Sequence, residues 1–281
     1  MGPRAFLKKN GFLFEKKPWP IEKALHKSLD ANGKETLENM WEMAKVGFHE
    51  PQSTMYLPQT PTQAAKLFSH DAQRAVASMT WISKTLSSLK TGTILELGCG
   101  AGFLLSYLKF IYPDFSFTGL ERIDNLANIA SEVSGVKIIN QDYVETSINQ
   151  RFDYLICDFG WNIEDIKSGP VPHDLQDFNG LKYCAGCSSA AEESYFKMIG
   201  GWKKMLADGG SIIVTGRLHS YGDIRAFLSA ANESGLSNVP EMNAWLKWKS
   251  WREIDRAPGI ILSESGSLTR SEIFNRAADF Y

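Results

Sequence analysis

The chain has 281 residues, of which 43% are hydrophobic and 22% are charged, and its formal net charge is −2. A chain so nearly neutral has no overall field that would draw it to nucleic acid or to an acidic membrane surface. It contains no apolar run of about 18 residues, so we expect no membrane-spanning helix. Its cysteines, at positions 99, 157, 184 and 187, are too few and too clustered for a disulfide framework, which indicates a cytoplasmic protein.

Residues 1–90 show helical periodicity and almost no strand signal. Leu37, Met40, Trp41, Ala44 and Phe48 repeat at three- and four-residue steps, which predicts an amphipathic helix. We therefore expect residues 1–90 to form a helical extension on the substrate side of a larger domain at 91–281. The basic residues near the N-terminus are expected to lie in a solvated tail.

Two further helices are predicted in this extension. Thr60 has the character of an N-cap, with Pro61 in the first turn and Gln63 completing a capping box. A second helix is expected from about Ser69. Its apolar stripe consists of Ala72, Val76, Met79, Ile82 and Leu86.

From Thr91 the pattern changes to short apolar runs that alternate with helices. Runs of this kind suit strands that are buried on both faces of a parallel sheet. The alternation predicts an α/β fold with a doubly wound, mostly parallel sheet. Ser189 with Glu192, and Ser220 with Asp223, are predicted to form capping boxes at helix starts. The expected strands are Thr93–Leu97, Phe115–Leu120, Val136–Ile139, Tyr154–Cys157 and Ser211–Thr215.

One connection is too long for a simple turn. It separates the strand that ends at Asp158 from the helix expected near Ser189, and it is rich in Gly, Pro, His, Asp and Tyr. Long loops in compact domains are usually functional. This one follows the carboxyl end of a strand, where open α/β sheets bind ligands. We expect it to bind substrate or to act as a lid.

Three glycines, Gly98, Gly100 and Gly102, occupy the turn between the first strand and the next helix. Glycine lets the backbone approach a ligand closely, and the helix N-terminus after the turn offers unpaired N–H groups. A dinucleotide site calls for G-x-G-x-x-G, but here the third glycine comes one residue early and Phe103 stands in its place. The spacing therefore argues against a nicotinamide oxidoreductase.

The segment Glu96-x-Gly98-x-Gly100-x-Gly102 resembles motif I of the class I, Rossmann-like S-adenosylmethionine (SAM)-dependent methyltransferases. The resemblance covers about residues 91–265 and implies a seven-stranded sheet, SAM as the cofactor and S-adenosylhomocysteine as the product. It names no family for residues 1–90.

Three acidic residues then follow in the order of that family. Glu121 resembles the residue that binds the ribose hydroxyls, and Asp142 resembles the residue that meets the adenine amino group. Asp158 resembles the motif that borders the methyl group and the substrate. The residues expected to bind the cofactor are therefore Glu96, Gly98, Cys99, Gly100, Gly102, Glu121, Arg122, Asp142, Tyr143 and Asp158.

Methyl transfer to an oxygen or an ammonium group also requires that a proton be removed, so we expect a base within hydrogen-bond reach. Asp158 is the nearest candidate by topology, and orienting the cofactor or the loop is an equal alternative. His173 and His219 are the other candidate bases. Trp161 and Tyr183 are expected to contact the substrate, although packing under the loop explains Trp161 equally well.

Two further patterns have plainer explanations. Cys184-Ala-Gly-Cys187 has neither a second cysteine pair nor a nearby histidine partner, so we favour a glycine-rich turn and predict no metal. Residues 245–252 interleave tryptophan with lysine and arginine, as nucleic-acid surfaces do. A helix or an edge strand with lysine stems lying along apolar surface is the favoured explanation.

These features predict a SAM-dependent methyltransferase that acts on an oxygen or nitrogen atom of a small-molecule acceptor, with no nucleic-acid or membrane partner. Asp158-Phe-Gly-Trp161 departs from the Asn/Asp-Pro-Pro-aromatic motif of amino-methylating nucleic-acid enzymes, which argues against a base as acceptor. The alternatives are an RNA or protein methyltransferase and a non-catalytic SAM-binding subunit. A homodimer is left open.

Overall fold

The computed structural model describes residues 1–47, 51–143, 148–161, 172–251, 253–264 and 266–281. Its centre is an eight-stranded sheet in the order β3-β2-β1-β4-β7-β10-β8, with β9 paired to β10. The strands from β3 to β7 run parallel to one another. Their bounds are β1 (Thr93–Leu97), β2 (Ser116–Leu120), β3 (Lys137–Ile139), β4 (Phe152–Asp158) and β7 (Leu206–Thr215).

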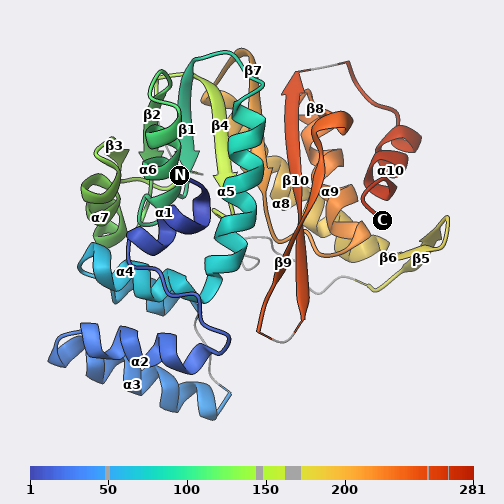
Figure 1. The fold of residues 1–281 in the computed structure, drawn as a ribbon. Helices are drawn as coiled ribbons and strands as arrows, with labels where there is room; N and C mark the ends of the chain where they lie inside the picture. The colour runs from blue at the N-terminus through green and yellow to red at the C-terminus, as the bar shows by residue number, and fades with distance from the viewer. Residues whose placement is uncertain (48–50, 144–147, 162–171, 252, 265) are drawn as a thin grey trace.

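Beyond β7 the strand direction reverses. β10 (Ile254–Glu264) runs antiparallel to β7, and both β8 (Leu236–Asn238) and β9 (Ala244–Lys249) run antiparallel to β10. The first half of β10 and its partner β9 extend past the parallel strands as a two-stranded ribbon (Figure 1). The doubly wound, mostly parallel sheet is thus confirmed, with β9 as one strand more than the seven expected.

Apolar side chains cover both faces of the parallel strands, as the uninterrupted apolar runs predict. Along β1, Leu95 and Leu97 enter one hydrophobic cluster while Ile94 enters the other. In β7, Ile212 and Val214 likewise belong to the first cluster and Ile213 to the second, because successive side chains of a strand point to opposite faces. The sheet is therefore the partition between two separate cores.

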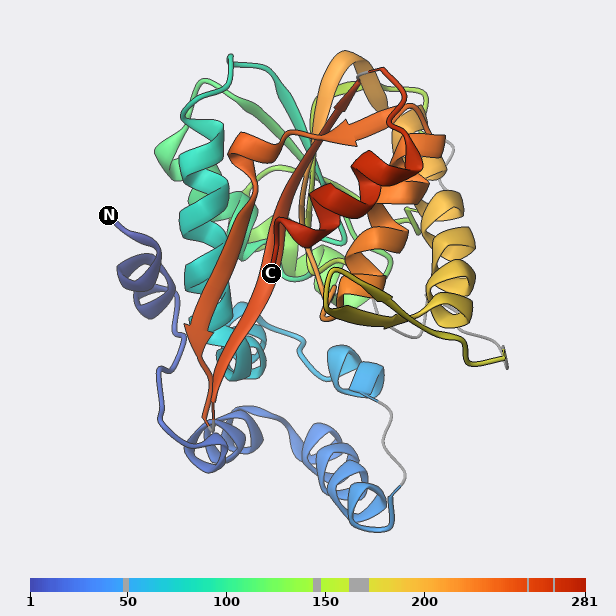
Figure 2. The ribbon, with the colours of Figure 1, turned by 90° about the vertical axis from the view of Figure 1, so that its right-hand side faces the viewer.

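Helices cover each of these faces (Figures 1 and 2). One face carries α5 (Ala72–Leu86), α6 (Phe103–Ile111) and α7 (Asp124–Ser134), and the other carries α8 (Ala185–Lys204), α9 (Tyr221–Glu233) and α10 (Arg270–Ala278). The helix predicted from about Ser69 is confirmed as α5, which follows a short 3-10 turn at Ser69–Asp71. Within the described ranges, none of the helices has the length and apolar character needed to cross a membrane.

The N-terminal helix packs against the first of these faces. α1 (Pro3–Lys9) inserts Phe6 and Leu7 into the same core as α5 and α6, and the rings of Phe6 and Tyr107 lie 5.2 Å apart. The lysines of α1 are exposed. The solvated tail predicted for this segment is therefore wrong, because one side of α1 is apolar enough to dock.

Three more helices lie near the carboxyl ends of the parallel strands (Figure 1). They are α2 (Pro18–Ser28), α3 (Ala31–Lys45) and α4 (Pro61–Phe68), and they enclose a small cluster of leucines. α3 confirms the predicted amphipathic helix, but of its stripe only Leu37 is buried and Trp41 is 36% exposed. Phe48 lies outside the described residues. The domain boundary at residue 90 stays a prediction, and the core shared by α1, α5 and the sheet spans it.

Two predicted helix starts agree with the structure at least in part. Ser220 and Asp223 form a complete capping box at α9. At α4 the Thr60 hydroxyl accepts the Gln63 N–H, but the Gln63 side chain accepts the N–H of Gln59 rather than that of Thr60. Of the capping box predicted at α4, only the hydrogen bond from the Gln63 N–H to the Thr60 hydroxyl is therefore formed.

The predicted start of α8 at Ser189 is wrong. The helix begins one turn earlier, because the Cys184 sulfur accepts the Cys187 N–H at 3.4 Å and serves as the N-cap. Ser189 lies inside the helix, and Glu192 forms an ion pair with Arg225 on α9 instead of capping.

The long connection after β4 contains secondary structure of its own. Residues 162–171 lie outside the described part, and after them the chain forms a hairpin of β5 (Leu175–Phe178) and β6 (Leu181–Cys184). Asn179 and Gly180 turn this hairpin with φ values of 53° and 86°, as two-residue hairpin loops require. A role for the connection in substrate binding or as a lid stays a prediction.

Candidate active site

The glycine-rich turn lies at the carboxyl end of β1. Gly98, Gly100 and Gly102 have φ values of 64°, 53° and 73°, which place all three in the left-handed region that favours glycine. Gly102 is the N-cap of α6 and caps it without a side chain. The first N–H groups of α6 therefore face the turn without a capping side chain.

Two of these glycines also have no room for a side chain. A Cβ on Gly98 would lie 2.9 Å from the carbonyl oxygen of Gly160, and one on Gly102 would lie 2.9 Å from the backbone of Ala130. The turn is thus packed between the segment after β4 and helix α7. Its shape is set by backbone contacts.

Glu121, directly after β2, holds this turn in place. Its Oε2 accepts the Gly100 N–H at 2.8 Å, and its Oε1 accepts the Ile123 N–H at 2.9 Å. The side chain is buried; desolvation raises the pKa of the carboxyl group, and these two hydrogen bonds partly oppose that rise. The structure therefore places Glu121 beside the glycine turn, as its predicted role requires.

Glu96 lies beneath the turn, where its side chain is 3% exposed. Among the described residues its Oε2 has no hydrogen-bond partner. Burial, followed by the neighbouring charges of Asp158 and Glu121, raises the pKa of Glu96 well above its ordinary value. An unpartnered buried carboxyl oxygen is a group that a polar ligand or a water molecule satisfies.

The other predicted cofactor residues lie around the turn at different depths. Arg122 and Asp142 form an ion pair at 3.3 Å, with side chains that are 41% and 29% exposed. Tyr143 is buried in the core. Cys99 is buried within the turn, and burial raises the pKa of its thiol well above the usual value. Arg122 and Asp142 therefore form the solvent side of this region and Glu121 its inner side.

Asp158 ends β4, and two hydroxyl groups hold its carboxylate. The Ser78 hydroxyl on α5 donates to Oδ2 at 3.0 Å, and the Thr215 hydroxyl at the end of β7 donates to Oδ1. Both of these residues are completely buried. The carboxylate is fixed in orientation, and each oxygen keeps a lone pair for a further donor.

A cavity of about 380 Å³ begins at the residue after Asp158. Phe159 has a φ of 54°, which is an uncommon value for a bulky residue. Its ring lies 4.1 Å from the Arg74 guanidinium and meets the Trp248 ring edge to face. The cavity is lined by Asp71, Arg74, Phe159, Arg217, His219, Trp245, Trp248, Glu253, Ile254, Asp255 and Arg256.

The charges in the wall of this cavity balance, since three arginines face three acidic residues. Arg74 pairs with Asp71 at 3.2 Å, and Arg256 lies 4.7 Å from the centre of a Trp245 ring. His219, predicted as a candidate base, is exposed in this wall. The structure thus brings His219 to the same edge of the sheet as Asp158.

Trp161 and Tyr183, predicted to contact substrate, are core residues in this structure. Trp161 is 2% exposed and stacks on Phe227, so the packing alternative is the one observed. Tyr183 is 7% exposed and packs edge to face on Tyr221, and its hydroxyl donates to Gln176. Neither ring offers an open face for stacking on a substrate.

His173, the third candidate base, lies against two thiols. Its Nδ1 is 3.5 Å from the Cys184 sulfur and 3.4 Å from the Cys187 sulfur. Hydrogen bonds from the Cys187 N–H and with His173 lower the pKa of Cys184 to about 6. His173 is therefore a histidine partner for the two cysteines, and the prediction that they have none is wrong.

Several residues of the site were missed from sequence. Thr215 could have been noticed, because it is a polar residue that closes an apolar strand next to β4. Ser78 is a polar residue inside a helix and carries no such signal. Phe159, Arg74 and Trp248 come from three separate elements, and only the folded chain brings them together.

Solved structures with similar folds include three methyltransferases. Magnesium protoporphyrin IX methyltransferase of Synechocystis, determined with bound SAM, is 14% identical over 73% of this chain and 83% of its own, with a TM-score of 0.44. The O-methyltransferase of a polyketide synthase of Brevibacillus brevis, determined with S-adenosylhomocysteine, is 10% identical over 76% and 80%, with a TM-score of 0.48. An N-methyltransferase of Bradyrhizobium japonicum is 16% identical over 69% and 96%, with a TM-score of 0.45. No protein-family model and no curated protein matches the sequence.

Proposed function

We propose that the chain is a SAM-dependent methyltransferase that acts on an oxygen or nitrogen atom of a small-molecule acceptor. One observation carries the proposal: the glycine turn, the buried Glu121 and the fixed Asp158 occupy the carboxyl ends of adjacent strands, with a cavity beginning at Phe159. Open α/β sheets bind their ligands at this edge. The sequence resemblance assigns the same residues to the cofactor.

The residues present fit SAM. The left-handed turn exposes backbone to a ligand, and the N-terminus of α6 suits the cofactor's carboxylate. The carboxylate groups of Glu121 and Asp142 are of the type that accepts hydrogen bonds from hydroxyl and amino groups. The unpartnered carboxyl oxygen of Glu96 adds a further polar group beneath the turn.

When bound, SAM supplies a methyl group carried on a positively charged sulfur, and this chain supplies alignment and a route for the acceptor's proton. Asp158 can accept that hydrogen bond or proton, since Ser78 and Thr215 fix its two oxygens without filling their lone pairs. His219, in the cavity wall, is the second candidate base.

The cavity favours a small acceptor. Its volume of about 380 Å³ lies within the range of small-molecule sites. Phe159, Trp245 and Trp248 offer ring surfaces to a planar group. Its balanced charges lack the excess of lysine and arginine that contacts a phosphate backbone.

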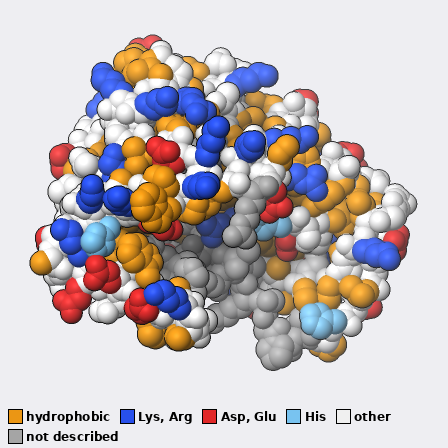
Figure 3. Space-filling model, turned by 60° about the horizontal axis from the view of Figure 1, so that its bottom comes forward, with side chains coloured by type: hydrophobic (Ala, Val, Ile, Leu, Met, Phe, Trp, Pro, Cys, Tyr) orange, Lys and Arg blue, Asp and Glu red, His pale blue; other side chains and the backbone are white. Residues whose placement is uncertain are grey.

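A nucleic-acid acceptor is the second candidate, and the outer surface favours it. Lys247 and Lys249 on β9 are exposed, and basic side chains are more frequent than acidic ones over the upper part of the face in Figure 3. Binding to RNA that weakens steeply as salt rises would support this candidate.

Calorimetric titration with SAM tests the cofactor assignment. Glu121→Ala is expected to weaken SAM binding at least about tenfold, because the turn loses its anchor and the ligand an acceptor. Glu132→Ala, which changes an exposed glutamate of α7, is the matched control and should bind as the parent protein does. Unchanged affinity in Glu121→Ala, or binding of NAD in place of SAM, would overturn the assignment.

Incubation with methyl-labelled SAM and a cell extract tests the acceptor. The extract is divided into a small-molecule fraction, an RNA fraction and a protein fraction before the reaction. Label in the small-molecule fraction is the expected result. Label confined to the RNA or the protein fraction would overturn the small-molecule acceptor and favour a macromolecular one. Label in no fraction would favour a non-catalytic SAM-binding subunit.

A further inference from the structure

His173, Cys184 and Cys187 form a compact group at the start of α8. Their three donor atoms all lie within 4.8 Å of one another. None of the three residues lines the cavity beside Asp158. His173 is exposed and both thiols are partly exposed, so a dissolved ion can reach the group.

The distances within the group match a tetrahedral metal centre. With Zn–S near about 2.3 Å and Zn–N near about 2.0 Å, adjacent S and N ligands of a tetrahedron lie roughly 3.5 Å apart. The observed distances from His173 Nδ1 to the two sulfurs are 3.5 and 3.4 Å. One ring nitrogen carries either a single proton or a single lone pair, so it cannot form good hydrogen bonds to both sulfurs at once. An ion shared by the three atoms explains both distances.

The local fold holds these donors together. Cys184 ends β6 and caps α8, and Cys187 follows in the first turn of the helix, where its N–H donates to the Cys184 sulfur. The hairpin returns the segment before β5 to the same place, since the Ala185 N–H donates to the Asp174 carbonyl at 2.6 Å. This bond sets His173, the residue before Asp174, beside the two thiols.

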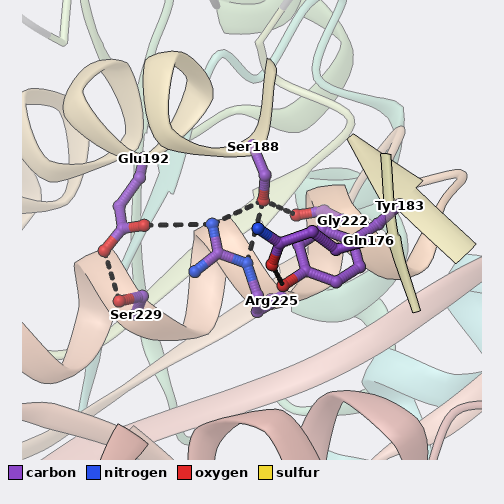
Figure 4. Close-up of polar contacts among 7 residues, drawn as sticks. All are labelled: Gln176, Tyr183, Ser188, Glu192, Gly222, Arg225 and Ser229. Carbon is purple, nitrogen blue, oxygen red and sulfur yellow. Dashed lines mark hydrogen bonds and ion pairs between the residues drawn. The ribbon is translucent and has the colours of Figure 1, made fainter. Parts of the chain in front are cut away.

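A buried network supports the same turn from beneath (Figure 4). Two nitrogens of Arg225 donate to the Ser188 hydroxyl at 2.9 and 2.6 Å, and that hydroxyl donates to the Gly222 carbonyl at 2.7 Å. Arg225 also pairs with Glu192 at 3.2 Å. These bonds fix the residue after Cys187 by contacts that need no metal, so the donor set is preorganised.

We propose that His173, Cys184 and Cys187 bind one zinc ion that fastens the start of the β5–β6 hairpin to α8. Two thiolates and an imidazole are the ligand types that zinc prefers in tetrahedral sites. Three protein donors leave one coordination position for a solvent molecule or an external ligand.

Metal analysis of the full-length, tag-free chain tests this proposal. The reduced protein is equilibrated with zinc chloride and desalted, and its zinc content is measured by plasma mass spectrometry. We expect about one zinc per chain, falling to background in Cys184→Ser, in Cys187→Ser and in His173→Ala. His26→Ala, which removes a partly exposed histidine that pairs with Glu38, is the matched control and should retain the full content.

Cobalt provides a readout that does not depend on stability. Co²⁺ bound by thiolates absorbs in the near ultraviolet through charge transfer, and this band should be present in the parent chain and in His26→Ala. It should be absent from both cysteine variants, whose far-ultraviolet circular dichroism reports whether they remain folded. Three results would overturn the proposal: no bound metal in the reduced parent chain, full zinc content in folded cysteine variants, or a Cys184–Cys187 disulfide in place of metal in protein purified without reductant.

Discussion

The sheet edge at the carboxyl ends of the parallel strands has two halves, and they differ in the chemical groups that form them. The half after β1 and β2 is mostly backbone, with left-handed glycines, an open helix N-terminus and a Glu121 carboxylate that binds main-chain N–H groups. The half that begins at Phe159 is mostly side chains, and they come from α5, β9, β10 and the ends of β4 and β7.

This difference indicates that the side-chain half can change its ligand specificity more readily than the backbone-built half. A turn that depends on positive φ values and backbone contacts loses its shape with almost any substitution. The side chains that line a cavity can be substituted without moving the strands that carry them. Such a fold can keep one cofactor while substitutions in the cavity wall change the acceptor that it fits.

Gly102→Ala should break the backbone-built half, and we expect the largest effect from it. The new Cβ would meet the backbone of Ala130 and the residue would keep a left-handed φ, so we expect a loss of about 2–4 kcal/mol in unfolding free energy. Displacement of the turn should weaken SAM binding by about 100-fold, measured by calorimetry.

Gly209→Ala is the matched control for this prediction. Gly209 has the same φ of 73°, but a Cβ there meets nothing within 4 Å. It should show only the backbone strain, about 1 kcal/mol, with SAM affinity unchanged. Equal effects in the two variants would contradict the close-approach argument.

Asp158→Asn probes the boundary between the two halves. If the carboxylate accepts the acceptor's proton, kcat should fall by about 100-fold or more while the Kd for SAM changes little. Thr215→Val, which removes one of the two hydroxyls that orient Asp158, should give a smaller fall in kcat. A parallel loss of affinity and turnover in Asp158→Asn would assign the residue to cofactor positioning.

Trp248→Ala should alter only the side-chain half. Loss of its ring from the cavity wall is expected to raise the KM for the acceptor by roughly tenfold and to leave the Kd for SAM unchanged. Trp251→Ala, on the same hairpin but outside the lining, is the control for general effects on β9 and β10. A weaker affinity for SAM in Trp248→Ala would mean that the halves are not separable.

Glu96→Gln should change the unfolding free energy alone, and the size of the change depends on pH. Because the pKa of Glu96 is raised in the folded protein, the folded chain keeps a proton that the unfolded chain releases above about pH 4.3. Stability should therefore fall as pH rises from that value toward the raised pKa. Glu96→Gln should flatten this fall and gain about 1–3 kcal/mol at pH 7, measured by urea unfolding. Glu132→Gln is the exposed control, and parallel curves for Glu96→Gln and the parent chain would contradict the prediction.

The backbone-built half could be predicted from sequence because its determinants are local. Glycine spacing, an acid at the end of each strand and an uninterrupted apolar run all lie within one strand and its turn. β1 was predicted to the residue, and β2 and β3 each begin one residue later than expected. Helix periodicity was less informative, since the stripe of α3 forms a helix without showing that Trp41 stays exposed.

The side-chain half could not be predicted, because its contacts join distant segments. Ser78 and Asp158 are 80 residues apart, and Asp158 and Thr215 are 57 apart. Trp161 and Tyr183 were assigned to substrate for their ring chemistry, whereas the fold uses both to fill its core. His173 and the two cysteines are brought together by the β5–β6 hairpin, and the composition of the loop gave no signal that predicted this hairpin.

The position of β10 in the sheet bears on the order in which the molecule folds. β8 precedes β10 along the chain, yet its pairing is with β10 and not with β7. β8 is therefore joined to the rest of the sheet only through β10. Contacts between segments so far apart form slowly, since the loop between them must close first. During synthesis the glycine turn and Glu121 are made well before the part of the cavity wall at residues 245–256, so a nascent chain contains the backbone-built half before the side-chain half is complete.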